Sequence, residues 1–214
     1  MKLKLLPLLL LTTLPALADE PISGDWNIAC PKGPDGKPYT GTVTFTPIGG
    51  VYQVAWNIPQ GNATGVGLPD GKNIAIAWGT GNYGLSVYAI GANGSLTGKW
   101  TQANQGDKTA VENATGGHPG VLDGQYKLLS ADFSGVRSEG TLKITKAGDF
   151  FKLDYKLGNE TYGGVGLRVG NSLYAAWGTS DNFGLLAYGF NGDKGAGKWV
   201  GNKSTAVVTE ALSK

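Results

Sequence analysis

The chain contains two copies of one sequence pattern, and this duplication constrains the fold more than any other feature. Four short motifs recur at an offset of about 99 residues. A repeated unit of roughly 90 residues is large enough to form its own core, so the pattern predicts two similar folded units. The motifs are Gly65-Val66-Gly67-Leu68, Trp78-Gly79-Thr80, Asn82-Tyr83-Gly84-Leu85 and Gly98-Lys99-Trp100, and then Gly164-Val165-Gly166-Leu167, Trp177-Gly178-Thr179, Asn182-Phe183-Gly184-Leu185 and Gly197-Lys198-Trp199.

Strand signals fill both copies, and helical periodicity is almost absent. Eight short segments per copy alternate apolar and polar residues or are apolar throughout, and the 36 glycines suit tight turns between them. Asp70-Gly71, Asn93-Gly94 and Asn191-Gly192 supply residues that accept the positive φ of short hairpins. The sequence therefore predicts an all-β protein of two tandem eight-stranded antiparallel meander barrels, calycin-like in plan, with a β-sandwich per repeat as the alternative.

The ends of the chain and its composition predict an exported protein. Residues 1–18 have a basic start, an apolar run and a small-x-small end, as in a secretory signal peptide. We expect the first barrel over 19–113, a linker over 114–120 and the second barrel over 121–214. The signal carries two of the 18 basic residues, so its loss leaves 16 basic against 16 acidic residues. This balance argues against a nucleic-acid partner. The mature chain shows no transmembrane segment, and a periplasmic or extracellular location follows.

Alternation along the strands predicts which side chains face inward. Phe151, Leu153 and Tyr155 share one face of their strand, and the matching strand of the first copy places Trp56 inward. The fifth and sixth strands of each copy are apolar on both faces, which indicates that both faces are covered. We expect these strands to pack the two units together or to form a dimer face, with small residues such as Ala75 permitting close approach.

The inward aromatic residues are the candidate ligand-binding side chains. Aromatic rings at a barrel mouth can hold a sugar, a heterocycle or an acyl chain, although eight strands leave an interior that side chains alone can fill. Both interpretations, ligand binding and core packing, stay open. The candidates are Trp56, Tyr155, Trp78, Trp177, Trp100 and Trp199.

Two carboxylates recur at the end of the last strand of each copy. Glu112 and Glu210 match one another, and the repeated Lys99 and Lys198 are nearby in sequence. We expect structural carboxylates that accept backbone hydrogen bonds or pair with these lysines, and a charged group at a binding mouth is the alternative.

Catalysis finds little support in the residue types present. One histidine, His118, and one cysteine, Cys30, exclude the usual metal-ligand clusters and most nucleophile–base pairs. We therefore expect no enzyme, no catalytic residues, no metal and no cofactor. A hydrolase based on a pair of carboxylates is the least favoured alternative. Cys30 cannot form an internal disulfide, and Ser130 takes its place in the second copy.

Two resemblances accompany these patterns. Gly24-Asp25-Trp26, echoed by Gly124-Gln125-Tyr126, resembles the Gly-x-Trp that opens lipocalin and avidin meander barrels. The run from Tyr39 through Trp56 to Gly98-Lys99-Trp100 is more similar to uncharacterised exported bacterial tandem-repeat β proteins, some of which carry a fibronectin-binding label. The second resemblance covers nearly the whole mature chain and implies little about function.

Together these observations predict a non-catalytic binding protein for a small apolar or sugar-like ligand held at aromatic-lined barrel mouths. A small-molecule or glycan ligand is the expected partner. The alternative is a protein- or envelope-interaction module that acts through the apolar outer faces of the strands, with a protein as partner.

Overall fold

The computed structural model describes residues 22–33 and 35–214, and every regular element in these ranges is a β-strand. The predicted signal peptide, 1–18, lies outside them. Within the same ranges, no helix has the length and apolar character needed to cross a membrane. The strands are β1 (Gly24–Cys30), β2 (Tyr39–Ile48), β3 (Val51–Ile58), β4 (Gly61–Asp70), β5 (Asn73–Gly79), β6 (Tyr83–Ile90), β7 (Leu96–Gln102), β8 (Ala110–Thr115), β9 (Gly124–Ala131), β10 (Arg137–Ala147), β11 (Phe150–Leu157), β12 (Glu160–Val169), β13 (Ser172–Gly178), β14 (Phe183–Asn191), β15 (Lys194–Gly201) and β16 (Val208–Ser213).

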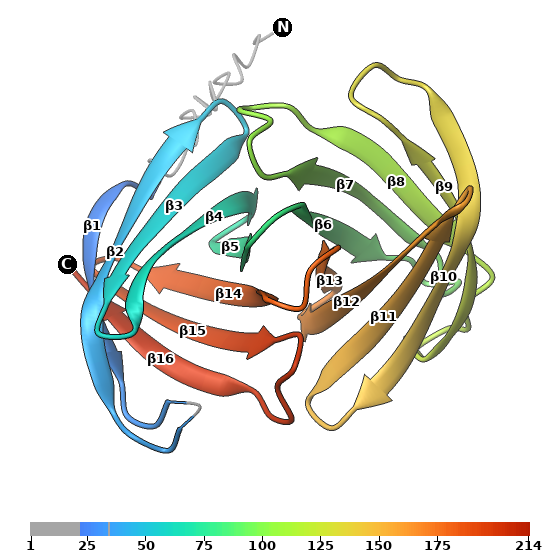
Figure 1. Ribbon diagram of the computed structural model, residues 1–214. Helices are drawn as coiled ribbons and strands as arrows, with labels where there is room; N and C mark the ends of the chain where they lie inside the picture. The colour runs from blue at the N-terminus through green and yellow to red at the C-terminus, as the bar shows by residue number, and fades with distance from the viewer. Residues whose placement is uncertain (1–21, 34) are drawn as a thin grey trace, which may run out of the picture.

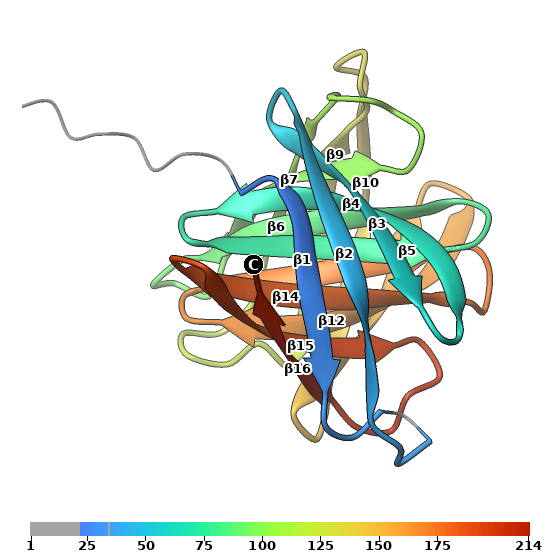
Figure 2. The ribbon, with the colours of Figure 1, turned by 90° about the vertical axis from the view of Figure 1, so that its left-hand side faces the viewer.

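The strands close into two antiparallel barrels of eight strands each, which lie side by side (Figure 1). Barrel A has the strand order β1-β16-β15-β14-β5-β4-β3-β2. In Figure 2 the side of the molecule that carries barrel A faces the viewer. Barrel B is made of β6 to β13, with β13 paired to β6 to close the ring. The prediction of two eight-stranded barrels is confirmed, and the sandwich alternative is excluded.

The barrels do not coincide with the sequence repeats. Barrel B runs without interruption from β6 to β13, so it joins three strands of the first repeat to five of the second. Barrel A combines β1–β5 with β14–β16 from the other end of the chain. The predicted units 19–113 and 121–214 therefore delimit the repeats but not the barrels. The predicted linker 114–120 is part of barrel B, because it includes the last two residues of β8 and continues into the connection to β9.

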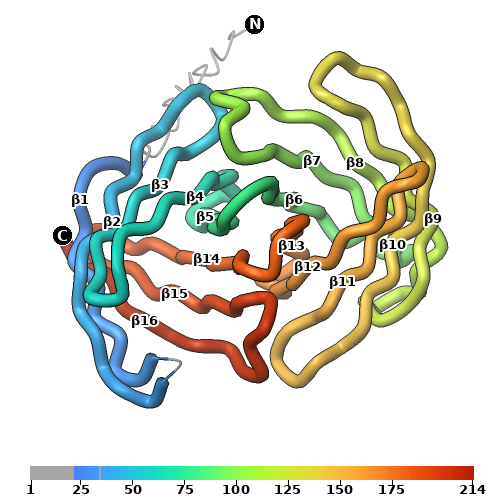
Figure 3. Tube along the Cα trace, viewed as in Figure 1, coloured from blue at the N-terminus to red at the C-terminus, as the bar shows by residue number. Residues whose placement is uncertain are grey.

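Two short connections carry the chain between the barrels and lie against each other at the centre of the molecule (Figure 3). The Thr80 amide donates to the Asn182 carbonyl at 2.9 Å, and the Thr179 amide donates to the Asn82 carbonyl at 3.0 Å. These residues belong to the repeated Trp-Gly-Thr and Asn-x-Gly motifs. The strongest repeat signal thus marks the crossing between barrels.

An apolar cluster between the barrels joins them. It contains outward-facing residues of β5 and β14 from barrel A, including Ala75, Ala77 and Leu185, together with Leu85 and Ala176 of barrel B. All five are less than one-tenth exposed. The prediction that the two-sided strands pack the units together is confirmed. Two further clusters fill the interiors of barrel A and barrel B separately.

Candidate functional site

One end of barrel A holds a pocket of about 390 Å³ among inward-facing side chains. This volume is at the small end of the range of about 300–1,000 Å³ that ligand pockets typically have. Trp56 of β3, Trp78 of β5 and Trp199 of β15 line it, as the alternation predicts. The complete lining is Ile28, Asp35, Tyr39, Trp56, Ile58, Gln60, Ala63, Trp78, Leu186, Trp199 and Glu210.

Repeated glycines make room for these rings on the neighbouring strands. A Cβ on Gly184 would lie 2.5 Å from the Trp78 ring, and one on Gly65 would lie 2.9 Å from the Trp56 ring. Contacts under 3.0 Å are closer than packed atoms tolerate. Gly65 lies within β4 and has no positive φ, so its lack of a side chain serves the packing of the neighbouring rings.

Glu210 of β16 places a carboxylate at the pocket although the residue is only 6% exposed. Its Oε2 accepts the Tyr39 hydroxyl at 2.6 Å, and its Oε1 accepts the Tyr188 hydroxyl. Burial raises the pKa of both Tyr39 and Tyr188, and the neighbouring Glu210 raises it further. Both phenols therefore remain protonated donors. The two phenols therefore hold the Glu210 carboxylate in place from both of its oxygens.

The strand register explains how Tyr188 reaches the carboxylate. Gly197 of β15 stands between Tyr188 of β14 and Glu210 of β16, and it pairs with both. A Cβ on Gly197 would lie 2.4 Å from the Tyr188 ring. The glycine of the repeated Gly-Lys-Trp motif is thus the gap across which the phenol meets the acid.

The lysines of that motif do not pair with the carboxylates. Lys198 pairs with Thr209, one residue before Glu210, and Lys99 pairs with Val111, one residue before Glu112. Because successive side chains on a strand point to opposite faces, the lysines lie outside the barrels and the acids inside. The expected lysine pairing is therefore wrong, and tyrosine hydroxyls hold the carboxylates instead.

Barrel B repeats the aromatic framework but fills the equivalent space with a further ring. Tyr155, Trp177 and Trp100 correspond to Trp56, Trp78 and Trp199 in barrel A. Tyr162 of β12 stacks on Tyr155 with ring centroids 5.0 Å apart and planes inclined by 13°, and its ring lies 5.2 Å from that of Trp177.

The corresponding position in barrel A is Ala63, which pairs with Trp56 as Tyr162 pairs with Tyr155. Barrel A thus has the methyl group of Ala63 beside the pocket where barrel B has the phenol ring of Tyr162.

A second ring closes barrel B from the connection between β9 and β10. Phe133 lies 4.5 Å from Trp100, and the Trp100 indole N–H donates to the Ala131 carbonyl at 2.9 Å. In barrel A the connection between β1 and β2 has no aromatic residue in its sequence from Pro31 to Pro38. The buried Trp199 Nε1 has no partner in the described part of the chain.

Glu112 in barrel B sits in a sealed environment and is 4% exposed. It accepts the hydroxyls of Tyr88 and Ser86. Burial raises the pKa of Glu112 above its ordinary value, while the hydrogen bonds from Tyr88, Ser130 and Ser86 act in the opposite direction. The matched acids thus differ in setting, since Glu210 reaches a pocket and Glu112 is enclosed.

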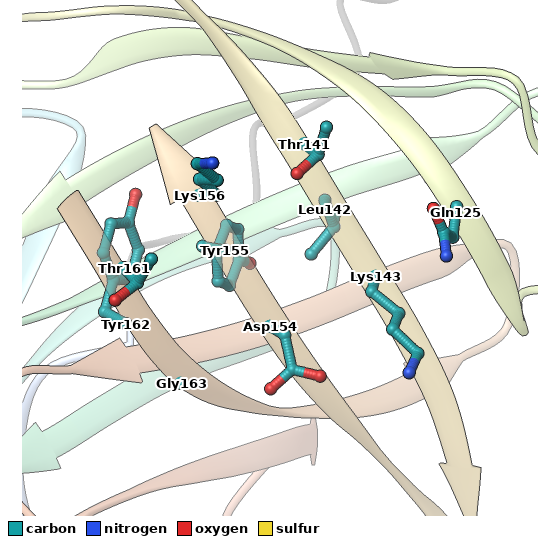
Figure 4. Close-up of a pocket in the computed structure, with 10 residues that line it drawn as sticks. All are labelled: Gln125, Thr141, Leu142, Lys143, Asp154, Tyr155, Lys156, Thr161, Tyr162 and Gly163. Atoms are coloured by element: carbon teal, nitrogen blue, oxygen red, sulfur yellow. The ribbon is translucent and has the colours of Figure 1, made fainter. Parts of the chain in front are cut away.

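Another hollow, of about 510 Å³, lies on the outer face of β10–β12 (Figure 4). Lys143, Asp154 and Lys156 line it, and their carbon stems and charged ends lie on the surface of the curved sheet. Tyr155 contributes to its wall from the inner side, where the ring is buried. This hollow carries both signs of charge, and Tyr162, which stacks on Tyr155, also lines it.

The single cysteine of the chain also lies in the interior of barrel A. Cys30 at the end of β1 is 2% exposed, and its thiol points to the Thr209 carbonyl at 3.5 Å. It lies near Tyr39 and contributes to the raised pKa of that phenol. A buried thiol of this kind is a packing group rather than an external bridge.

Comparison with known proteins adds no assignment: no family model, curated protein or solved structure matches the chain. The resemblances noted from the sequence stay predictions. Sequence reasoning found the three tryptophans and the carboxylate of the pocket, but it missed Tyr39 and the residue that opens the pocket, Ala63. Aligning the two repeats position by position, with attention to small residues opposite aromatic ones, would have revealed the Ala63–Tyr162 difference.

Proposed function

We propose that the protein is a non-catalytic binding protein that holds one small ligand in the barrel A pocket. The observation that carries this proposal is the pocket of about 390 Å³, lined by Trp56, Trp78 and Trp199 and bordered by the Glu210 carboxylate. The export predicted from residues 1–18 supports a role outside the cytoplasm.

The mixture of rings and few polar groups is typical of a small-molecule site. Apolar and aromatic side chains provide contact area, and a small number of placed polar groups fix the orientation of a ligand. Here the polar groups are few: Glu210, the Tyr39 hydroxyl, Gln60 and Asp35. The opening is also accessible from outside, because a wider hollow of about 720 Å³ shares Trp78 and Trp199 with the pocket.

The two alternatives have less support. An interaction module was expected to use the apolar outer faces of the two-sided strands, but residues such as Ala77, Leu85 and Leu185 on those faces are buried between the barrels. A carboxylate-pair hydrolase would need two acids facing one substrate. The repeated acids Glu112 and Glu210 lie inside different barrels, and the second acid of the barrel A pocket, Asp35, is an exposed residue of the connection between β1 and β2.

The proposal predicts that Ala63→Tyr, which copies Tyr162 into barrel A, abolishes ligand binding. The test is native mass spectrometry of the purified protein against a library of small amines, sugars, heterocycles and short acyl acids. Wild type should take up one ligand per chain, and the variant should take up none because the new ring occupies the space beside Trp56.

The matched control is Ala55→Tyr, which adds the same side chain at an exposed position of the same strand as Trp56. It should bind as wild type does. Equal binding by wild type and Ala63→Tyr, or no ligand bound by wild type from any class, would contradict the proposal.

A further inference from the structure

The charge of the barrel A pocket is one-sided. Among its lining residues are two acids, Glu210 and Asp35, and there is no lysine, arginine or histidine. Within the described residues, the one salt bridge joins Lys203 to Asp181 at 3.1 Å on the surface. In that part of the chain, therefore, no lysine, arginine or histidine forms a salt bridge with Glu210. Because two acids line the pocket and no basic residue does, its lining favours a cation over an anion such as an acyl carboxylate.

The rings add a second attraction for positive charge. The face of an aromatic ring carries negative potential, and tryptophan attracts cations more strongly than tyrosine or phenylalanine does. Trp56, Trp78 and Trp199 all line the pocket, and Tyr39 is a fourth ring beside the carboxylate. Three indoles that line one pocket together with a carboxylate supply the groups that recognise substituted ammonium ions in aromatic cages.

The hydrogen bonding of Glu210 points the same way. Tyr39 and Tyr188 each donate to a different oxygen of the carboxylate, so its position is fixed before a ligand arrives. A ligand need not supply a strong hydrogen-bond donor to hold this acid in place. A diffuse cation with little hydration, such as a quaternary or alkylated ammonium, suits such a site.

We propose that the ligand of barrel A is a small organic cation, an amine or quaternary ammonium carried on a compact apolar group. The cationic head lies among the tryptophans next to Glu210, and the apolar body contacts Ile28, Ile58 and Leu186. This inference rests on the proposed function, because it names the ligand class of the same pocket.

The test compares probes that share one ring and differ in charge. Benzyltrimethylammonium, benzyl alcohol and benzoate are titrated into the purified protein by isothermal calorimetry, with methyl glucoside as a sugar probe. The cation should bind with one site per chain, benzyl alcohol at least tenfold more weakly, and benzoate and the sugar without detectable heat.

The charge contribution is isolated by Glu210→Gln, which keeps the size of the side chain and one oxygen acceptor for a tyrosine. This variant should lose at least tenfold in affinity for benzyltrimethylammonium while its weak binding of benzyl alcohol is retained, which also shows that the pocket is intact. Glu112→Gln makes the same change in the enclosed site of barrel B and should leave the affinity unaltered.

The outcomes separate the two proposals. If benzyl alcohol or the sugar binds as tightly as the cation, or if Glu210→Gln binds the cation as wild type does, the ligand class is wrong while the pocket still functions. If no probe of any charge binds to wild type, both the cation and the binding function are overturned.

Discussion

Barrel A and barrel B present the same inward pattern of rings and acid, yet one is open at its mouth and the other is filled. The difference traces to a few positions: Ala63 against Tyr162, and a connection without rings against one that brings Phe133 onto Trp100. The framework of a duplicated barrel can therefore persist in both copies while small side chains determine which copy has a cavity. Barrel B shows what the aromatic framework does when it serves packing alone.

The hydrogen-bond partners of the two matched acids, Glu112 and Glu210, also differ between the filled and the open barrel. In barrel B, Glu112 accepts hydroxyls from Tyr88 and Ser86, and the position of Ser86 is taken in barrel A by the apolar Leu186. In barrel A, Tyr39 supplies the second hydroxyl, and Ser138 occupies the matching position in barrel B. The second hydroxyl therefore comes from Tyr39 in barrel A and from Ser86 in barrel B. Tyr39 and Glu210 both border the barrel A pocket, which can admit a ligand.

The largest effect on the filled barrel is expected from Tyr162→Ala. The substitution removes the ring that stacks on Tyr155 and contacts Trp177, and truncation of a packed aromatic residue costs about 2–4 kcal/mol when part of the ring is exposed. Chemical denaturation should show this loss in the free energy of unfolding. Thr161→Ala at the adjacent exposed position should stay within about 0.5 kcal/mol of wild type. A Tyr162→Ala variant as stable as wild type would show that the ring does not fill barrel B.

A smaller effect is expected from Glu112, the enclosed acid, on how the free energy of unfolding depends on pH. Since burial raises the pKa of Glu112, the folded state favours the neutral acid. The unfolded chain ionises first as the pH rises above the ordinary value of 4.5, so the free energy of unfolding falls until the pH passes the raised pKa and then levels off. Glu112→Gln should remove this part of the decrease.

The control for this measurement is Glu139→Gln, an exposed acid on β10 of the same barrel. Denaturation curves collected between pH 4 and pH 8 for wild type and both variants make the comparison. A wild-type curve that rises with pH over this interval relative to Glu112→Gln would mean that the folded barrel favours the charged acid.

Much of the fold could be predicted because alternation and duplication are local properties of the sequence. The inward faces of β3 and β11 and the two-sided apolar strands follow from side-chain periodicity, and both agree with the structure. The assignment of strands to barrels could not be predicted in the same way. β5 pairs with β14 where a barrel made from one repeat would pair it with β6, and β6 and β14 have nearly the same pattern.

The open pocket was beyond the sequence for a related reason. Trp56 and Tyr155 have the same inward direction in both barrels, so alternation cannot tell a ring that lines a space from one that fills it. That outcome depends on the side chain paired with each ring across the neighbouring strands. The pairing of Glu210 with tyrosines was hidden similarly, because Tyr39 and Tyr188 are distant from it in sequence.

The most direct test of the difference between the barrels uses the six tryptophans as reporters. The protein is labelled with 5-fluorotryptophan, each ¹⁹F resonance is assigned by a Trp→Phe substitution, and benzyltrimethylammonium is titrated in. The resonances of Trp56, Trp78 and Trp199 should shift together along one saturation curve, while those of Trp100 and Trp177 stay in place. Equal shifts of the barrel B resonances with the same affinity would contradict an open barrel A beside a filled barrel B.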